Sequence, residues 1–133
     1  MSTIDRFEDL EAWKLARTLT GSVYSVSGLG QFGHDFALRD QIRRASISIV
    51  SNISEGFERD GDKEFIQFLS VAKGSCGEVR AQLYLALDQK YISEDQFQEL
   101  TTKALQLSRI ISGLIRYLRQ SHFTGKKYKT VGL

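Results

Sequence analysis

The chain has 133 residues, of which 41% are hydrophobic and 26% are charged, and its formal net charge is +2. These values are typical of one globular domain and exclude a chain that is disordered throughout. The single cysteine, Cys76, excludes an internal disulfide framework and a thiolate-cluster metal site. The absence of proline favours long uninterrupted helices over turn-rich sandwiches and barrels.

The first predicted helix runs from about Glu8 to Ser27. Its apolar residues recur three or four positions apart, at Ala12, Leu15, Ala16, Leu19, Val23 and Val26. Glycines then interrupt the pattern, and we expect a loop over Gly28–His34. Asp35 follows as a candidate N-cap for the next helix.

The second predicted helix runs from about Phe36 to Glu58, with apolar residues at helical spacing along its length. Gly61 follows the end of this helix, and Asp62 is a candidate N-cap for the third helix. The apolar stripe of that third helix consists of Phe65, Phe68, Leu69, Ala72, Cys76, Val79, Leu83 and Leu87.

The fourth predicted helix begins with a capping box, in which Ser93 is the cap and Gln96 occupies the third helical position. Its apolar residues alternate in steps of three and four, as in a heptad seam: Phe97, Leu100, Ala104, Leu107, Ile111, Leu114 and Leu118. Four amphipathic helices with short links predict an all-α, up-down-up-down four-helix bundle over residues 1–121. Residues 122–133 are expected to form a flexible basic tail.

Charge is distributed unevenly along the chain. All 16 acidic residues lie at or before Glu99, whereas the predicted tail holds three lysines and no acid. A basic patch also lies on the second helix and extends to the third. The candidate nucleic-acid contacts are therefore Arg39, Arg43, Arg44, Lys73, Lys126, Lys127 and Lys129. The alternatives are ion pairing with nearby acids such as Asp40 and, for the tail, a solubilising end.

Catalytic and metal sites find little support in the sequence. Di-iron bundles need Glu-x-x-His pairs, and neither His34 nor His122 completes one. Cys76 lies on an apolar stripe, as a core cysteine does, without a neighbouring histidine to activate it. Glu55 and Glu78 are predicted near bundle-facing positions, either as an acid–base pair or as hydrogen-bond acceptors at a packing junction. We expect no catalytic residue, no metal, no cofactor and no small-molecule substrate.

Two further patterns concern packing. Small residues share one face of the third helix, at Ser70, Gly74, Gly77 and Ala81. Such a ridge lets another backbone approach closely, within the bundle or at a subunit interface, and this offsets a propensity cost of about 1 kcal/mol for each helical glycine. The second and fourth helices also carry surplus apolar residues, which indicate either a partner surface or a broad core-facing side. These are Ile47, Val50, Ile110, Ile115 and Tyr117.

The sequence also predicts where the protein is found in the cell. Its acidic start lacks the apolar segment of a secretory signal. No apolar run approaches the roughly 20 residues that a membrane-spanning helix needs. A lone free cysteine fits a reducing compartment. We therefore expect a cytoplasmic protein that does not associate with membranes.

Several ordered motifs resemble those of a bacterial protein family. The segment Phe7–Trp13 is similar to F-x-D-L-x-x-W. Residues 41–45 read Q-I-R-R-A, and residues 48–56 are similar to S-I-x-x-N-I-x-E-G. Residues 64–78 are similar to E-F-x-x-F-L-x-x-A-x-G-S-x-x-E, and Tyr91-Ile92 completes the set. Over about residues 7–118, these motifs resemble the four-helix bundle proteins encoded within intervening sequences of 23S rRNA genes.

The resemblance implies a bundle that assembles as a ring-shaped homopentamer and has an undefined link to RNA. The residues that match its motifs, and for which it implies a structural role, are Trp13, Asn52, Glu55, Gly56, Gly74, Ser75 and Glu78. The chain departs from the family in its glycine-rich first loop, where a proline is common. It also departs at Ser54, which replaces a usual alanine, and at Gly77, an additional helix glycine.

Two functions follow from these patterns. The first is a non-enzymatic oligomer that associates with RNA through its basic surface and tail. The alternative is an oligomeric protein–protein interaction scaffold that does not bind nucleic acid.

Overall fold

The computed structural model describes residues 4–120, so the predicted tail with Lys126, Lys127 and Lys129 lies outside the described residues. Within residues 4–120 the chain forms four long helices, one short helix and one 3-10 turn, and no strand. In chain order these are η1 (Phe7–Asp9), α1 (Glu11–Ser27), α2 (Gly30–His34), α3 (Phe36–Glu58), α4 (Asp62–Asp88) and α5 (Glu94–Gln120). The all-α prediction is confirmed.

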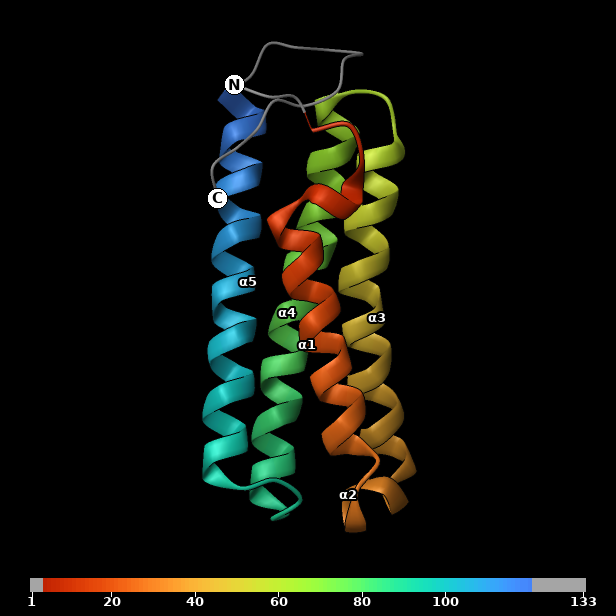
Figure 1. The fold of residues 1–133 in the computed structure, drawn as a ribbon, viewed down its shortest axis with the longest axis vertical. Helices are drawn as coiled ribbons and strands as arrows, with labels where there is room; N and C mark the ends of the chain where they lie inside the picture. The colour runs from red at the N-terminus through yellow and green to blue at the C-terminus, as the bar shows by residue number, and fades with distance from the viewer. Residues whose placement is uncertain (1–3, 121–133) are drawn as a thin grey trace.

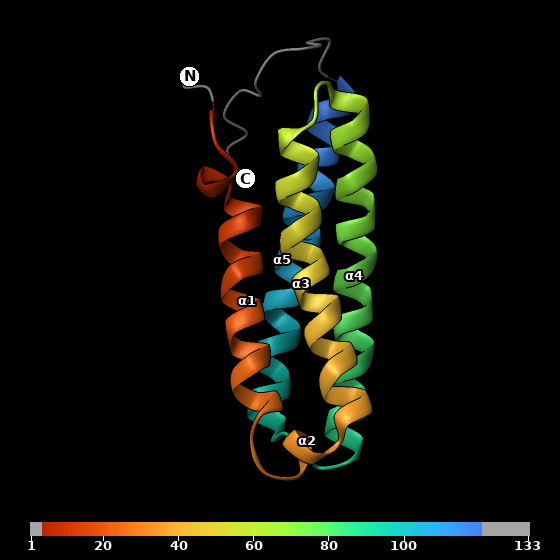
Figure 2. The same ribbon diagram turned by 90° about the vertical axis from the view of Figure 1, so that its right-hand side faces the viewer.

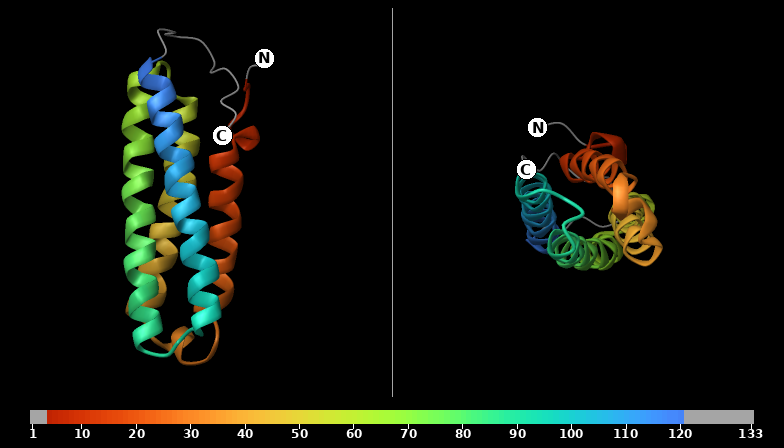
Figure 3. Two further views of the ribbon diagram at one scale, coloured as in Figure 1. Left: turned by 90° about the vertical axis from the view of Figure 1, so that its left-hand side faces the viewer. Right: turned by 90° about the horizontal axis from the view of Figure 1, so that it is seen from below.

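The long helices α1, α3, α4 and α5 form an elongated bundle with up-down-up-down connections (Figure 1). Viewed from one end, they follow one another around the bundle in that order (Figure 3). Each packs against the two helices that flank it. The short helix α2 and the α4–α5 turn close the same end of the bundle (Figure 2).

A single apolar core runs between the four long helices, and the predicted stripes supply it. Every seam residue of α5, from Phe97 to Leu118, is buried. Burial of a side chain the size of leucine contributes about 1.5–3 kcal/mol relative to exposure, so these stripes are the main source of stability. The helical periodicity therefore located the core correctly.

Helices α3 and α4 approach closely at Gly56. A Cβ at this buried position would lie 2.7 Å from Cβ of Phe68 and 2.9 Å from Cδ1 of Phe65. Real Cβ atoms do not tolerate such distances, so only glycine fits between the two helices without a shift of the backbone. The family-motif glycine therefore sets the spacing of this helix pair.

A short polar chain adds a second link between the same helices. Ser75 on α4 donates a hydrogen bond of 2.9 Å to Oγ of Ser48 on α3. Asn52 donates to the backbone oxygen of Ser48 at 2.8 Å and to its hydroxyl at 3.1 Å. Two of the family-motif residues, Asn52 and Ser75, thus meet at one serine and join α3 to α4.

Trp13 links α1 to α3. Its indole Nε1 donates a hydrogen bond of 2.8 Å to Oγ of Ser54, and its ring packs against Phe7 with centroids 5.2 Å apart. The departure from alanine at Ser54 has a physical role here, because it supplies the acceptor that the half-buried indole N–H needs.

Two of the three predicted caps are confirmed. Oδ1 of Asp35 accepts a hydrogen bond of 3.1 Å from the backbone N–H of Leu38, and Ser93 and Gln96 exchange the two bonds of a capping box. The prediction for Asp62 was wrong, because Gly61 is the N-cap and Asp62 is the first residue of α4. Gly61 has φ +95°, a conformation that glycine adopts without strain.

The expected loop Gly28–His34 was wrong in part, since α2 forms a short helix within it. The side chain of Phe32 is fully buried and stacks on the Tyr91 ring at 5.3 Å. Tyr91 also donates a hydrogen bond of 2.9 Å to Oδ2 of Asp35, and this bond raises the pKa of Tyr91. Tertiary burial of one aromatic residue therefore orders a segment whose glycines predict a loop. Similarly, α1 begins at Glu11 rather than Glu8, because residues 7–9 form the 3-10 turn.

We expect Gly56→Ala to lower the free energy of unfolding by about 1–3 kcal/mol, because the new methyl group overpacks the contact with Phe68. Gly77→Ala is the matched control, since a Cβ there meets nothing within 4 Å. That substitution is expected to raise stability by about 0.5–1 kcal/mol through helix propensity. Urea unfolding midpoints measure both changes, and a midpoint for Gly56→Ala at or above that of wild type would contradict the packing account.

Candidate functional site

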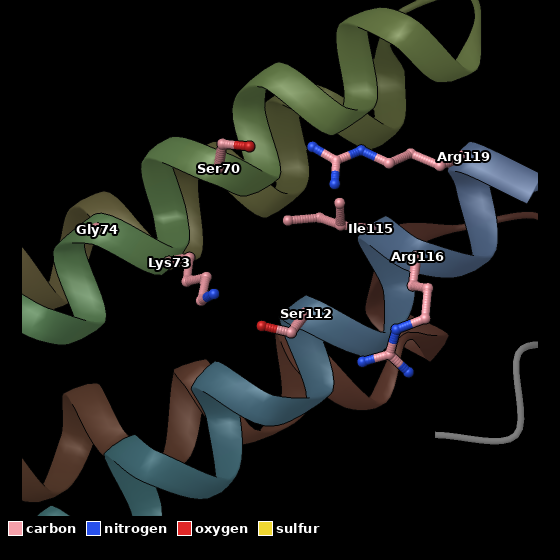
Figure 4. Close-up of a pocket in the computed structure, with 7 residues that line it drawn as sticks. All are labelled: Ser70, Lys73, Gly74, Ser112, Ile115, Arg116 and Arg119. Carbon is pink, nitrogen blue, oxygen red and sulfur yellow. The ribbon is translucent and has the colours of Figure 1, made fainter.

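A surface groove of about 630 Å³ lies between α4 and α5 (Figure 4). Helix α4 contributes a lysine, a serine and a glycine, and α5 contributes two arginines, a serine and an isoleucine. The lining residues are Ser70, Lys73, Gly74, Ser112, Ile115, Arg116 and Arg119. Because three of them are cations and none is acidic, the groove carries a local charge of +3.

The polar side chains of the groove come from both of its walls. In Figure 4 the guanidinium of Arg119 points across the groove toward Ser70, and the side chains of Lys73 and Ser112 point toward each other from the two helices. Arg116 lies at the outer edge with its guanidinium turned away from α4. Within residues 4–120, none of the three cations forms an ion pair with a carboxylate.

The groove is basic because α5 contains no acid after Glu99. Arg116 and Arg119 are three positions apart and therefore share a side of the helix. On α4, Gly74 keeps the floor open, since a Cβ there would meet nothing within 4 Å. The sequence analysis missed both arginines. The sequence contains no acid after Glu99, and this could have indicated that the arginines of the fourth helix lack acidic neighbours in the sequence. The pattern was used only to predict a basic tail.

This arrangement can bind anions. An arginine guanidinium presents a fork of N–H donors that fits phosphate oxygens, and a lysine ammonium adds a compact charge with three donors. The hydroxyls of Ser70 and Ser112 can donate to a phosphate oxygen or accept from a ribose hydroxyl. The seven lining residues include no carboxylate, histidine or cysteine.

Lys73 lies in this groove, but Arg43 has partners inside the fold. Its Nε donates to Oγ of the buried Ser27 at 2.8 Å, and its Nη2 donates to the backbone oxygen of Tyr24 at 3.3 Å. The guanidinium also lies over the Tyr24 ring, 4.4 Å from the centroid. Arg43 therefore holds the C-terminal end of α1 against α3.

The other two basic residues of α3 differ from each other. Arg39 donates to the backbone oxygen of Gly33 at 3.1 Å and pairs with Asp40 at 2.9 Å, so the ion-pair alternative holds at this residue. Arg44 is exposed and forms no ion pair within the described residues. A nucleic-acid role for Arg39, Arg43, Arg44 and Lys73 stays a prediction, as does one for the tail lysines outside the described residues.

The expected positions of the two glutamates were wrong. Glu55 and Glu78 are both exposed instead of facing the bundle, and Glu55 pairs with Arg59 at 2.8 Å. Cys76 is fully buried, as predicted, and desolvation raises its pKa to about 12 despite the nearby charge of Arg80. A thiol with that pKa stays protonated at neutral pH and is a poor nucleophile.

Residues 4–120 contain no group of three histidine, cysteine or acidic side chains that could hold a metal ion. In the same range, no helix is both long and apolar enough to cross a membrane.

The surplus apolar residues of α5 belong to the core. Ile115 is 7% exposed, and Ile110 and Tyr117 pack against the core cluster, so α5 has a broad core-facing side rather than a second stripe. On α3, Ile47 remains 44% exposed. Gly74 and Gly77 face open space, which removes close packing inside this bundle as their explanation.

The fold is thus an all-helical bundle with a basic groove along one helix pair. A family model described as 23S rRNA-intervening sequence protein matches residues 8–113, and the chain belongs to this family, as its motifs predict. It is also similar to the crystal structure of a protein of unknown function from the S23 ribosomal protein family of Bacteroides thetaiotaomicron. The TM-score is 0.73 and the identity 20%, over 79% of this chain and 98% of that chain. At this identity the likeness concerns the fold alone. No curated protein matches the sequence significantly.

Arg43→Ala is expected to lower the free energy of unfolding by about 1–3 kcal/mol, because it removes a bond to the buried Ser27 hydroxyl and two contacts with Tyr24. Arg44→Ala removes the same charge from the same helix, but that side chain is exposed, and we expect a change within about 0.5 kcal/mol. Urea unfolding of both variants makes the comparison. Equal effects of the two substitutions would show that Arg43 does not hold α1 and α3 together.

Proposed function

We propose that this protein is a non-enzymatic, oligomeric RNA-associated protein of the cytoplasm, and that its RNA contact is the groove between α4 and α5. The observation that carries the proposal is the meeting of Lys73, Arg116 and Arg119 at one groove without an acidic partner. The family description refers to intervening sequences of 23S rRNA, which makes RNA the first polyanion to test.

The chain beyond α5 supports the same proposal. Helix α5 ends at Gln120, directly after Arg119, and the three tail lysines follow within the next nine residues. They are Lys126, Lys127 and Lys129. A groove and a tail joined at the same helix end act on one RNA with a high effective concentration. An oligomer multiplies this effect, because every copy adds a groove and a tail.

The proposed binding is electrostatic. A phosphate that enters the groove releases its condensed counterions, so affinity falls as salt concentration rises. Contacts of this kind position an RNA backbone and do not read sequence. The proposal therefore involves broad RNA association, and it needs no catalytic group.

The alternative function, an oligomeric scaffold, also has an observation in its favour. Val71 and Leu85 on α4 are 53% and 51% exposed, and Ile47 on α3 is 44% exposed. Exposed apolar side chains on one helix pair suit a contact between copies. The pentameric ring that the motif resemblance implies would need such a heterologous interface. Self-association is compatible with RNA binding, whereas a scaffold without RNA binding is the competing function.

We expect the wild-type protein to bind a structured RNA hairpin with an affinity that falls steeply across a salt series, measured by fluorescence anisotropy. Arg119→Gln removes one phosphate contact and should lower the magnitude of the log–log salt slope by about 1. Arg109→Gln is the matched control, because Arg109 is an exposed arginine of the same helix that does not line the groove. Absence of binding even at low salt would reject RNA association and favour the scaffold.

Light scattering of the purified protein is expected to give a particle of five 15.1-kDa chains. Val71→Glu places a charge on the exposed apolar face of α4 and should shift the mass toward a single chain, because burying an unpaired carboxylate is unfavourable. Gln98→Glu, at an exposed polar position of α5, is the control and should leave the mass unchanged. A monomeric wild-type protein would contradict the ring.

A further inference from the structure

Proteins commonly bind single-stranded nucleic acid through exposed aromatic rings, because unpaired bases stack on them. Residues 4–120 expose three aromatic side chains, and each already has a partner against its ring. A guanidinium carbon lies over two of them, at 4.4 Å and 4.7 Å, and another ring packs edge-on against the third at 4.8 Å. The pairs are Arg43 on Tyr24, Arg39 on Phe36, and Phe97 against Tyr84.

None of these rings lines the basic groove. Tyr84 follows Gly74 by ten residues, which is about 15 Å along α4. Trp13 is half-buried on α1, where the guanidinium of Arg17 lies 5.6 Å from its ring centroid. The groove therefore offers charges and hydroxyls to a ligand but no platform for an unpaired base.

The floor of the groove has no side chain at Gly74, and Gly77 lies about one turn further along α4. A Cβ at either position would meet nothing within 4 Å. Glycine lowers helix propensity, and within residues 4–120 no contact requires it at these positions. An open floor suits a rigid ligand, which cannot bend around a protruding side chain.

From these observations we infer that the groove binds double-stranded RNA in preference to single-stranded RNA. The inference rests on the RNA association proposed above. A duplex keeps its bases stacked inside and presents phosphates and 2′-hydroxyls at fixed spacing across a wide, shallow minor groove. Lys73 and Arg119 can donate hydrogen bonds to the phosphates. Ser70 on α4 and Ser112 on α5 offer hydroxyls that can bond a phosphate oxygen or a 2′-hydroxyl. A single strand would gain the charge contacts but not the base stacking on which its binding depends.

The test compares two RNAs on the full chain: a blunt duplex of about 16 base pairs, the length that a compact duplex-binding module spans, and one of its strands with no self-pairing. Fluorescence anisotropy gives both affinities at a fixed salt concentration. Gly74→Gln fills the floor with a good helix former. Gly21→Gln is the matched control, because Gly21 is also a helical glycine with open space, on α1 outside the groove.

We expect wild type to bind the duplex at least tenfold more tightly than the strand. Gly74→Gln should remove most of this preference, and Gly21→Gln should keep it. If Gly74→Gln weakens binding to both RNAs by the same factor, RNA association stands and the duplex preference of the groove is overturned. If the duplex preference survives Gly74→Gln, the groove is not its source. If wild type binds neither RNA at low salt, the proposed function itself fails.

Discussion

The contact between Gly56 on α3 and Phe65 and Phe68 on α4 is the constraint on which the rest of the structure depends. The backbone of α3 at Gly56 packs directly against these two side chains of α4. A Cβ on Gly56 would lie within 2.9 Å of an atom of each phenylalanine. Such a contact fixes both the spacing of the helices and the rotation of α4 about its own axis, because interiors are close-packed and do not deform gradually. With that rotation fixed, Ser75 meets Ser48 on one flank of α4. The opposite flank carries Lys73 and Gly74 toward α5.

The arginines of this protein separate into two groups by their partners, although their charges are identical. Arg39 and Arg43 donate to backbone oxygens at the α2 end of the bundle and lie over aromatic rings. Using them for an outside ligand would break bonds that stabilise the fold. Arg116 and Arg119 form no ion pair within residues 4–120, and they line the same groove as Lys73. The two groups of arginines are therefore distinguished by whether their guanidinium groups have partners inside the fold, which the sequence alone does not show.

Helical periodicity alone located the four long helices and their core, as the buried seam of α5 from Phe97 to Leu118 shows. The caps at Asp35 and Ser93 were also predictable, because a cap is a local interaction within three residues. The features that could not be predicted depend on tertiary packing. Phe32 orders a glycine-rich segment only because a core is present to receive it. The rotation of α5 about its own axis decides which of its sides faces α4, and therefore which arginines line the groove. Periodicity predicts this rotation only approximately. The same coarseness placed Glu55 near the core when it is exposed.

The three cations of the groove have the same charge and form no ion pair with a carboxylate within residues 4–120, so they repel one another in the free protein. All three side chains are exposed, and salt screens this repulsion over a Debye length of about 8 Å. An anion in the groove removes this repulsion, and the open floor at Gly74 lets it approach without displacing a side chain. Added salt then opposes binding in two ways, because it reduces the repulsion that binding relieves and it reduces the counterion release from the ligand. Both effects have the same sign, so the salt dependence of binding measures the charge of the groove together with that of its ligand.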